Sequence, residues 1–273
     1  MSPLTTQQVL DAAAAMQWTP KGTIELLTDD YRLVRYPEWM VCRTFPAAHV
    51  TWSRTARPLD EVIVEVAERV RGWALPRVAW WVSAASQPPD TEETLRAYGA
   101  ALINETRVLA RGLGEPDIGA PVGVDVELVR DERTFRAASD LTVRGWRRTE
   151  PDQAEFARQL AEALGELERQ SVFRVVAYVN GQPVSTGGCT LAADAGPAGQ
   201  VSQVAQLWGA FTLPAFRGRG CYRAVLAEQL RLARQHGVGL ALVKGRVLTL
   251  APILLRSGFA DYGGERCYWL PVG

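Results

Sequence analysis

The segment from Leu207 to Leu226 constrains the fold of this chain more than any other feature. It reads Leu-Trp-Gly-Ala-Phe-Thr-Leu-Pro-Ala-Phe-Arg-Gly-Arg-Gly-Cys-Tyr-Arg-Ala-Val-Leu. This pattern predicts an apolar strand, a turn rich in Arg and Gly, and the start of an amphipathic helix. The first turn of a helix leaves backbone N–H groups unpaired and carries the positive end of the helix dipole. The junction therefore predicts a site for phosphate.

Two residue types in the turn strengthen that prediction. Gly218 and Gly220 allow the backbone to adopt positive φ and to approach a ligand closely. Arg217, Arg219 and Arg223 add full positive charges whose planar guanidinium groups can donate paired hydrogen bonds to phosphate oxygens. We therefore expect backbone amides and arginines to hold the anion together.

Length and charge limit the classes of partner. A chain of 273 residues accommodates two domains of about 100–150 residues each. Lys and Arg total 30, and Asp and Glu total 30, so no overall field attracts nucleic acid or an anionic membrane. We expect neither partner, and the arginines of the turn act as a local basic patch.

Cysteine and histidine usage argues against a metal site or a disulfide framework. The four cysteines are widely separated, form no CxxC pair, and are accompanied by only two histidines. Buried thiols without a neighbouring base are also more typical of packing than of nucleophiles. A reducing cytoplasm suits this composition. The first residues lack the basic and apolar stretches of an export signal, so we expect a soluble, cytoplasmic protein.

Apolar periodicity and turn residues predict alternating helices and strands along the chain. In the first half we expect helices at 4–16, 59–71 and 91–98, and strands at 24–27, 31–35, 39–42, 78–82 and 101–109. Residues 112–121 are rich in turn formers and predict a linker. In the second half we expect strands at 124–129, 172–179, 184–191, 201–213, 240–243 and 262–270, and helices at 132–144, 152–169, 222–236 and 249–257. Asn180-Gly181 suits a type I′ hairpin turn.

The turn Arg217-Gly-Arg-Gly220-Cys-Tyr222 resembles motif A of the GNAT superfamily of acyl-CoA-dependent N-acyltransferases. That motif, Arg/Gln-x-x-Gly-x-Gly/Ala, follows the fourth strand of the family fold and starts its third helix. The strand here ends in Leu213-Pro214, as is usual in the family, whereas Tyr222 departs by occupying a small-residue position. The resemblance implies an α+β (mixed α/β) fold of two GNAT-like modules, each a mixed, mostly antiparallel twisted sheet flanked by helices.

The two halves of the chain share a plan but not the motif. Leu95 to Gly99 and Leu254 to Gly258 each end a predicted helix and lead into a final strand. The first half has no Arg/Gly-rich turn, and the organisation resembles tandem GNAT proteins with one working half, such as the mycothiol synthase type. We therefore expect a degenerate GNAT-like domain at 1–115 and an acyl-CoA-binding catalytic domain at 122–273.

The resemblance also implies where acetyl-CoA binds as the acyl donor. In the family, the pantetheine arm lies between the diverging fourth and fifth strands, and the pyrophosphate lies on the Arg/Gly turn. No metal is implied. By position, the coenzyme-binding residues are Ala210, Phe211, Thr212, Arg217, Gly218, Arg219, Gly220, Cys221, Tyr222 and Arg223.

Proton handling departs from the family pattern. Gln206 stands where some members place a glutamate on the fourth strand, and it can orient water but cannot act as a general base. We therefore predict that Gln206 is the catalytic residue. Leu254 stands where a tyrosine usually protonates the departing thiolate, and Val247 replaces a family asparagine.

Three accounts of these departures stay open. An amine deprotonated through water at Gln206 can react with proximity supplying most of the acceleration. Alternatively Tyr262, Tyr268 or Thr249 supplies the acid from another position. In the third account the domain binds acyl-CoA without turning it over.

The acceptor site is predicted from two tryptophans. Trp146 lies with Arg147 and Arg148 in the segment that commonly walls the acceptor site in the family, and Trp208 shares strand parity with Gln206. These arginines suit an acidic or aromatic acceptor, or form a solvated basic face. Trp208 is also compatible with simple core packing.

The function that follows from the resemblance is transfer of acetyl from acetyl-CoA to a primary amine by direct attack. The acceptor is expected to be a small-molecule or peptide amine. A non-catalytic acyl-CoA-binding or scaffold protein is the competing class, and transfer of a longer or charged acyl group is a third reading. The oligomeric state is left open, a homodimer included.

Overall fold

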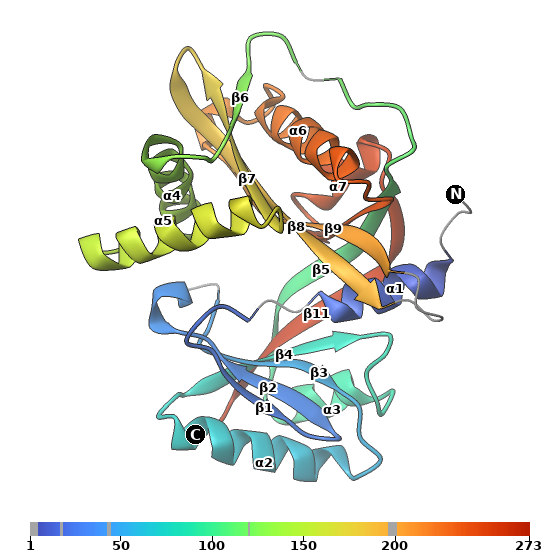
Figure 1. Ribbon diagram of the computed structural model, residues 1–273. Helices are drawn as coiled ribbons and strands as arrows, with labels where there is room; N and C mark the ends of the chain where they lie inside the picture. Colours follow the sequence, from blue (N-terminus) through green and yellow to red (C-terminus); the bar gives the residue numbers. More distant parts are fainter. Residues whose placement is uncertain (1–4, 17–18, 43–44, 120, 196–200) are drawn as a thin grey trace. The chain divides into compact units, whose positions relative to one another are not determined.

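The computed structural model describes residues 5–16, 19–42, 45–119, 121–195 and 201–273, with side chains undescribed at 193–195 and 201–203 (Figure 1). The chain divides into two compact units. We call residues 1–16, 108–244 and 253–262 the motif unit, because they contain the Arg/Gly turn. Residues 17–107, 245–252 and 263–273 form the N-terminal unit. Each combines helices with part of a mixed sheet, which confirms the predicted fold class.

The motif unit is built on strands in the order β5-β10-β9-β8-β7-β6. The β6, β7, β8 and β9 strands pair antiparallel, and β9 pairs parallel with β10. Its elements are α1 (Thr6–Ala15), the end of β5 (Ala101–Gly112), β6 (Asp125–Leu128), α4 (Glu132–Trp146), α5 (Gln153–Glu168), β7 (Val172–Val179), β8 (Gln182–Ala195), β9 (Val201–Thr212), η2 (Pro214–Phe216), α6 (Cys221–Gln235) and β10 (Leu240–Arg246).

Helices cover both faces of the motif unit's sheet (Figure 1). On one face, α6 packs Val225 and Leu232 against Phe173 and Val175 of β7. On the other, α4 and α5 pack against β7 around a cluster that includes Phe135. Alternate residues of each strand therefore face different helices, as the period-two geometry of a strand requires.

The N-terminal unit has the strand order β1-β2-β3-β4-β11-β5. Helix α2 buries one apolar stripe against the sheet, where Trp80 and Tyr268 are fully buried. The β3 and β4 strands pair parallel, and β4 pairs antiparallel with β11. Its elements are β1 (Ile24–Leu27), β2 (Tyr31–Arg35), η1 (Glu38–Met40), β3 (Ala48–Ser53), α2 (Leu59–Gly72), β4 (Arg77–Ser83), α3 (Thr91–Ala97) and most of β11 (Ala260–Pro271), while α7 (Ala251–Arg256) has residues in both units.

Three strands change unit along their length, β10 only at its last two residues. β5 begins in the N-terminal unit and ends in the motif unit, whereas β11 does the reverse from residue 263 onward. The strand at 262–270, expected to close the sheet of the second module, instead pairs with β4, for example Tyr268 with Trp80. An apolar strand fits either sheet by composition, so its pattern does not reveal its partner. The compact units therefore cut across the predicted ranges 1–115 and 122–273, which stay a prediction about function.

Other differences from the predicted elements are local. Residues 39–42 were expected as a strand, but Pro37 precedes the 3-10 turn η1, in which the Met40 N–H donates to the Pro37 carbonyl at 3.0 Å. The strand β3 was not predicted. Residue 4 of the first predicted helix lies outside the described residues. The predicted hairpin turn is confirmed, because Asn180 and Gly181 have φ of 51° and 76°.

Two helices end in the same way, as the paired sequence segments predict. Gly99 after α3 and Gly258 after α7 have φ of 82° and 84°. In both, the next N–H bonds back to a leucine carbonyl, from Ala100 to Leu95 at 3.0 Å and from Phe259 to Leu254 at 3.1 Å. This pattern is the Schellman helix end. Its recurrence supports a duplicated plan.

Candidate active site

The turn before α6 has the backbone conformation that the sequence predicts. Gly218 and Gly220 have φ of 75° and 79°, in the left-handed region that glycine adopts without strain. Gly220 is the N-cap residue of α6. A Cβ at Gly220 would also lie 2.9 Å from Cγ of Pro121, so close packing as well as φ requires glycine there.

The start of α6 is available to an anion. No side chain caps the helix, and its first turn contains no acidic residue. The first amides of a helix have no partner within the helix and lie at the positive end of its dipole. Three other helices of this unit do have such a cap, because Thr5, Asp131 and Asp152 each accept a backbone hydrogen bond at the starts of α1, α4 and α5. The α6 start therefore has the chemistry of a phosphate site.

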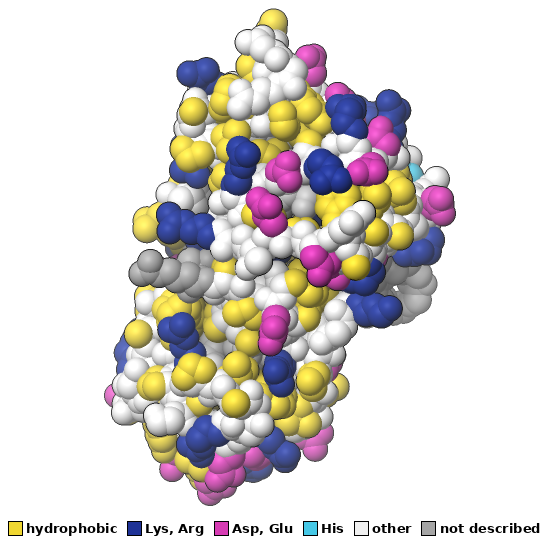
Figure 2. Space-filling model, turned by 90° about the vertical axis from the view of Figure 1, so that its left-hand side faces the viewer, with side chains coloured by type: hydrophobic (Ala, Val, Ile, Leu, Met, Phe, Trp, Pro, Cys, Tyr) yellow, Lys and Arg dark blue, Asp and Glu magenta, His cyan; other side chains and the backbone are white. Residues whose placement is uncertain are grey.

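Three exposed arginines surround this helix start. The Arg217 Nε donates to the Thr212 carbonyl at 3.2 Å, and the Arg219 guanidinium lies 5.4 Å from the Phe216 ring centroid. Within the described residues, neither they nor Arg223 form an ion pair with a carboxylate. Figure 2 shows basic and acidic side chains interspersed on one face of the molecule, in keeping with a net charge of zero. The uncompensated charge at the turn is thus local.

The unusual Tyr222 packs into the core. Its ring lies against the cluster that contains Phe173 and Val225, and burial raises the pKa of its hydroxyl. Burial likewise raises the pKa of the neighbouring Cys221 thiol. Both groups are therefore neutral at physiological pH and contribute packing at the helix start.

The β9 and β10 strands diverge, as the resemblance implies. Their parallel pairing runs from Val204–Leu240 to Gln206–Leu242 and stops there. Both strands continue, β9 to Thr212 and β10 to Arg246. The edge of β9 beyond Gln206 therefore has backbone groups without partners on β10. Such an edge can pair with an extended ligand arm.

A bulge interrupts the pairing of this part of β9 with β8, on the side of the strand away from β10. Trp208 pairs with Gly188 and Phe211 with Thr186, so Gly209 and Ala210 together oppose one residue of β8. Gly209 has φ of 67°, and nothing lies within 4 Å of a Cβ built there. A bulge leaves its extra residue outside the ladder, which provides backbone amide groups at the point of divergence.

The predicted pantetheine residues follow the bulge. Ala210, Phe211 and Thr212 are half-buried. The Ser185 hydroxyl donates to the Phe211 carbonyl at 2.9 Å and lies 2.8 Å from the Thr212 hydroxyl. The Phe211 ring packs on α4, where a Cβ at Gly145 would be 2.6 Å away. The strand segment is thus held rigidly on its β8 side.

The residues considered for proton transfer lie in different units of the chain. Gln206 is half-buried at the last pair before the divergence, and Leu254 is fully buried. Tyr262 lies in the motif unit, whereas Tyr268 and Thr249 lie in the N-terminal unit. The Tyr268 hydroxyl donates to Glu92 at 2.7 Å. Of the alternative acids, only Tyr262 shares the unit of the Arg/Gly turn.

Sequence reasoning missed Arg174, which lies beside the predicted acceptor residue Trp208. The Arg174 guanidinium carbon is 4.9 Å from the Trp208 ring centroid. The indole Nε1 donates to Thr190 at 2.8 Å, which fixes the ring. Burial lowers the pKa of Arg174. An arginine inside a strand gave no signal, because the alternation of β7 shows only which face a residue occupies.

The other predicted acceptor residue ends α4. Trp146 is the last residue of that helix, and Arg147 follows in the left-handed conformation with φ of 52°. Arg148 comes next, half-buried, and its charge acts on Arg174. The loop thus supplies a second guanidinium to the neighbourhood of Trp208.

The corresponding junction of the N-terminal unit, between β3 and α2, has different chemistry. Pro58 is the N-cap residue, and Asp60 and Glu61 occupy the first turn of α2. Arg57 pairs with Glu65 at 3.0 Å. These carboxylates place negative charge where the α6 start has none, so the junction disfavours a phosphate.

The end of β3 is also closed by backbone hydrogen bonds. Gln87, after β4, donates its N–H to the Ser53 carbonyl at 3.2 Å and accepts from the Thr55 N–H at 3.3 Å. The equivalent edge of β9 has no such partner on β10. An extended ligand arm therefore has no free backbone edge here.

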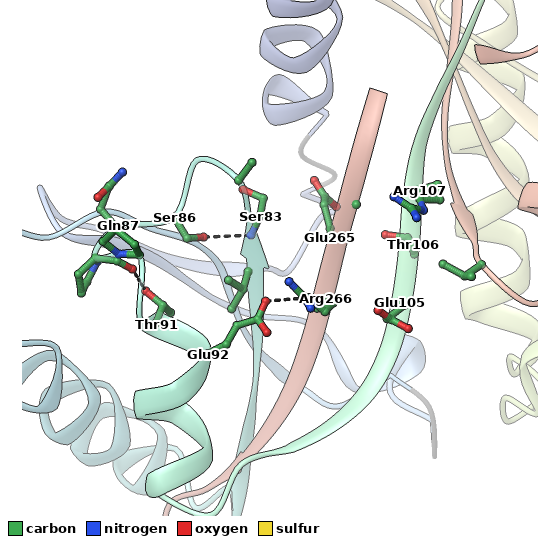
Figure 3. Close-up of a pocket in the computed structure, with 16 residues that line it drawn as sticks. Ser83, Ser86, Gln87, Thr91, Glu92, Glu105, Thr106, Arg107, Glu265 and Arg266 are labelled. Atoms are coloured by element: carbon green, nitrogen blue, oxygen red, sulfur yellow. Dashed lines mark hydrogen bonds and ion pairs between the residues drawn. The ribbon is translucent and has the colours of Figure 1, made fainter. Parts of the chain in front are cut away.

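A polar hollow of about 590 Å³ lies elsewhere in the N-terminal unit (Figure 3). Glu92, Arg266 and Thr106 line it, and Glu92 accepts from the Arg266 Nε at 2.7 Å. The buried Thr106 hydroxyl has no hydrogen-bonding partner among the residues that the structure describes. None of the predicted coenzyme or catalytic residues lines this hollow.

The part of the chain that the structure describes has neither a metal-binding cluster nor a membrane-spanning helix. No group of three or more His, Cys, Asp or Glu side chains is arranged to hold a metal ion. None of the described helices has the length and apolar character needed to cross a membrane.

Solved structures share the fold along most of the chain. A GCN5-related N-acetyltransferase from Kribbella flavida has a TM-score of 0.68 at 17% identity, covering 97% of this chain and 96% of its own. A tandem GNAT protein from the clavulanic acid biosynthesis pathway has a TM-score of 0.61 at 15% identity, covering 97% and 88%. A GCN5-related N-acetyltransferase from Sphaerobacter thermophilus has 0.58 at 19%, covering 90% and 82%. These identities establish likeness of fold.

The family assignment comes from the sequence of the motif unit. No curated protein is similar enough in sequence to match the chain. The family model described as "Acetyltransferase (GNAT) family" matches residues 135–245, which span the Arg/Gly turn, the bulge and the diverging strands. The chain therefore contains a GNAT-family acetyltransferase domain at residues 135–245, within a fold that it shares with GNAT N-acetyltransferases along most of its length.

Proposed function

We propose that this protein transfers acetyl from acetyl-CoA to a primary amine by direct attack, and that the motif unit does so. The observation that carries this proposal is the juxtaposition of an uncapped helix start with an unpaired strand edge. The first feature suits a pyrophosphate and the second an extended amide-containing arm. Both lie within one compact unit, joined by the turn from Leu213 to Gly220.

The proposed coenzyme contacts divide into two groups. Ala210 to Thr212 offer backbone groups to the pantetheine arm, because their strand edge lies beyond the last pair with β10. The amides of the α6 start and the charges of Arg217, Arg219 and Arg223 hold the pyrophosphate. Cys221 and Tyr222 contribute their backbone, since both side chains are neutral and packed.

The proposed chemistry needs little from side chains. The amine nitrogen attacks the thioester carbonyl, the C–S bond breaks, and the amine proton leaves through water oriented by Gln206. A backbone amide at the Gly209 bulge can stabilise the developing oxyanion, an effect of about 2.7–4 kcal/mol per donor in measured cases. Solvent or Tyr262 returns a proton to the CoA thiolate. Holding the two reactants together supplies most of the acceleration.

We also propose that the N-terminal half is a degenerate GNAT-like domain that does not bind acetyl-CoA. Two features support this: the acidic first turn of α2, and the backbone bonds of Gln87 that close the end of β3. Of the predicted catalytic range 122–273, residues 245–252 and 263–273 belong to the N-terminal unit, and the motif unit adds residues 1–16 and 108–121.

A non-catalytic acyl-CoA-binding protein is the second candidate. It is favoured by the lack of a titratable side chain at both usual proton-handling positions, Gln206 and Leu254. The two candidates share coenzyme binding and differ in turnover. Their separation therefore requires an assay of the chemical step.

Thiol release from acetyl-CoA, measured with a panel of primary amines and corrected for hydrolysis, tests the proposal. We expect amine-dependent release that is lost in the Arg217→Ala, Arg219→Ala double variant. Acetyl-CoA binding without release for any amine would instead identify a binding protein. The absence of coenzyme binding would contradict both candidates.

The acid step is tested by a matched pair at Leu254. This side chain is fully buried, so both Leu254→Tyr and Leu254→Phe add bulk, and they differ only by a hydroxyl. We expect equal turnover in the two variants if solvent or Tyr262 already protonates the thiolate. Several-fold faster turnover in Leu254→Tyr alone would show that the wild-type site lacks an effective acid.

A further inference from the structure

Arg174 is half-buried against aromatic rings, and within the described residues its guanidinium has no hydrogen-bonding partner. It lies 4.9 Å from the Trp208 ring centroid and 5.9 Å from that of Phe135. Among the described residues, no carboxylate or carbonyl forms an ion pair or hydrogen bond with it. A desolvated charge without such partners is unfavourable. Its presence on a sheet face therefore indicates a role beyond packing.

The carboxylates near Arg174 act on its charge from a distance and do not bond to it. Glu166 of α5 attracts the guanidinium, but no ion pair joins the two groups, and burial raises the pKa of that carboxyl. Arg148, from the loop after α4, adds a second positive charge that acts on Arg174. Glu162 of α5 adds a second, weaker attraction to Arg174. Neither carboxylate is bonded to Arg174, so its N–H groups stay available to a ligand that brings a carboxylate of its own.

The strand register places this charge beside the proposed reaction centre. Arg174 pairs with Gly188, and Gly188 pairs with Trp208, so the three form one row across β7, β8 and β9. Because Gly188 has no side chain, the Trp208 ring lies over it; a Cβ there would be 2.4 Å from the ring. Trp208 is two residues beyond Gln206, where β9 leaves β10, and both share one face of the strand.

We propose that the amine acceptor carries a carboxylate that binds the Arg174 guanidinium, with Trp208 as the platform that orients it. This inference rests on the proposed function. Stacking on an indole leaves the guanidinium N–H groups directed along the ring plane, ready to donate two parallel hydrogen bonds to a carboxylate. Arg174 is then a specificity-determining residue, and the acceptor is an amino acid, a peptide or another amino carboxylate.

Binding of matched acceptor pairs to the CoA complex tests the proposal without requiring turnover. The probes are glycylglycine, alanine and aminohexanoate, each compared with its carboxamide by calorimetry. In the wild type we expect at least one carboxylate to bind about 10- to 100-fold more tightly than its amide, the range for a charge-assisted contact. Arg174→Gln should abolish that difference, and Arg174→Lys should retain part of it.

A second arginine–tryptophan stack provides the matched control. Arg77 lies 3.9 Å from the Trp269 ring centroid in the N-terminal unit, so Arg77→Gln removes a similar stack away from the motif unit. It should leave the carboxylate preference unchanged. The CoA affinity of Arg174→Gln should also equal that of the wild type, which separates loss of specificity from loss of fold.

The outcomes distinguish this inference from the proposed function. Equal binding of carboxylate and amide for every pair, binding of neither member, or a preference that survives Arg174→Gln would overturn the inference. Carboxylate-selective binding without acetyl transfer to any amine would overturn the proposed function alone. Transfer to amines irrespective of a carboxylate would support the function and contradict the inference.

Discussion

The starts of α6 and α2 occupy corresponding positions in the two units and differ in their charge. α6 follows two glycines of positive φ and has no acidic residue in its first turn, whereas α2 follows Pro58 and begins with Asp60 and Glu61. One helix start attracts an anion and the other repels it. A short segment therefore decides which unit can hold a pyrophosphate.

The ends of the same two helices are alike. Gly237 after α6 and Ala74 after α2 both have positive φ, of 74° and 57°. The following N–H bonds back to the helix at 3.2 Å in each, from Val238 to Ala233 and from Leu75 to Val70. The shared helix end maintains the packing of helix on sheet, and the differing start determines ligand chemistry. Fold and function are thus carried by different ends of one element.

The strands beside these helices differ in the same direction. β9 leaves β10 after Gln206 and has a bulge at Gly209, whereas the end of β3 is bonded by Gln87. In the motif unit both the helix start and the strand edge suit the coenzyme, whereas in the N-terminal unit both disfavour it. Changes that affect one unit and leave the other intact provide the most informative tests of this contrast.

The largest effect is expected from removing charge at the α6 start. In the Arg217→Ala, Arg219→Ala variant, each lost phosphate contact is worth about 1.5–3 kcal/mol. We therefore expect acetyl-CoA affinity to fall by at least about 100-fold, measured by calorimetry. Arg57→Ala changes the arginine of the α2 junction and should leave the affinity unaltered. Unchanged affinity in the double variant would defeat the assignment of the pyrophosphate site.

A smaller effect is expected from the glycines of the turn. Alanine at position 220 would have a strained positive φ and a Cβ only 2.9 Å from Pro121 Cγ. Alanine at position 218 would have the strained φ alone, because nothing lies within 4 Å of its Cβ. We expect Gly220→Ala to lower the free energy of unfolding by about 1–3 kcal/mol and to weaken coenzyme binding. Gly218→Ala should cost less by both measures. Denaturant unfolding and calorimetry check the ranking, and a larger loss in Gly218→Ala would contradict it.

The N-terminal unit should show a pH dependence of its own. Burial lowers the pKa of His49 on β3 from its ordinary 6.5 to about 4. The unfolded chain then binds the proton more readily, so the free energy of unfolding falls as the pH decreases from about 6.5 towards 4. By pH 5 the loss is about 2 kcal/mol. This contribution is absent above pH 7, where His49 is neutral in both states.

His49→Phe isolates that contribution. The imidazole packs with Tyr36 and Phe45, with ring centroids 5.0 and 4.4 Å away, so phenylalanine retains an aromatic ring without a titrating group. Denaturant unfolding at pH 7 and pH 5 should show a loss about 2 kcal/mol smaller in the variant. An identical loss in both proteins would mean that His49 is not the group involved.

Local sequence signals predicted much of the fold. Glycine positions gave the turn before α6 and the ends of α3 and α7, and Asn180-Gly181 gave the hairpin, because each requires positive φ. These local signals do not predict which strands pair with each other. The pairing of β11 with β4 depends on contacts between residues nearly two hundred positions apart, which periodicity does not encode.

The candidate site was predictable only where backbone conformation defines it. The Arg/Gly turn and the divergence of β9 from β10 follow from the motif and its context. Arg174 and the Gln87 backbone bonds were not predictable, because a half-buried arginine on a strand and a closing loop have no distinctive sequence pattern. Their importance appears only once the register brings Trp208 and Ser53 beside them.

The stoichiometry of acetyl-CoA binding tests the central contrast most directly. Calorimetric titration of the full chain is predicted to give one site, abolished by the Arg217→Ala, Arg219→Ala variant and retained when Asp60 and Glu61 are changed to Asn and Gln. Two sites in the wild type, or one site that survives the arginine changes, would contradict the account.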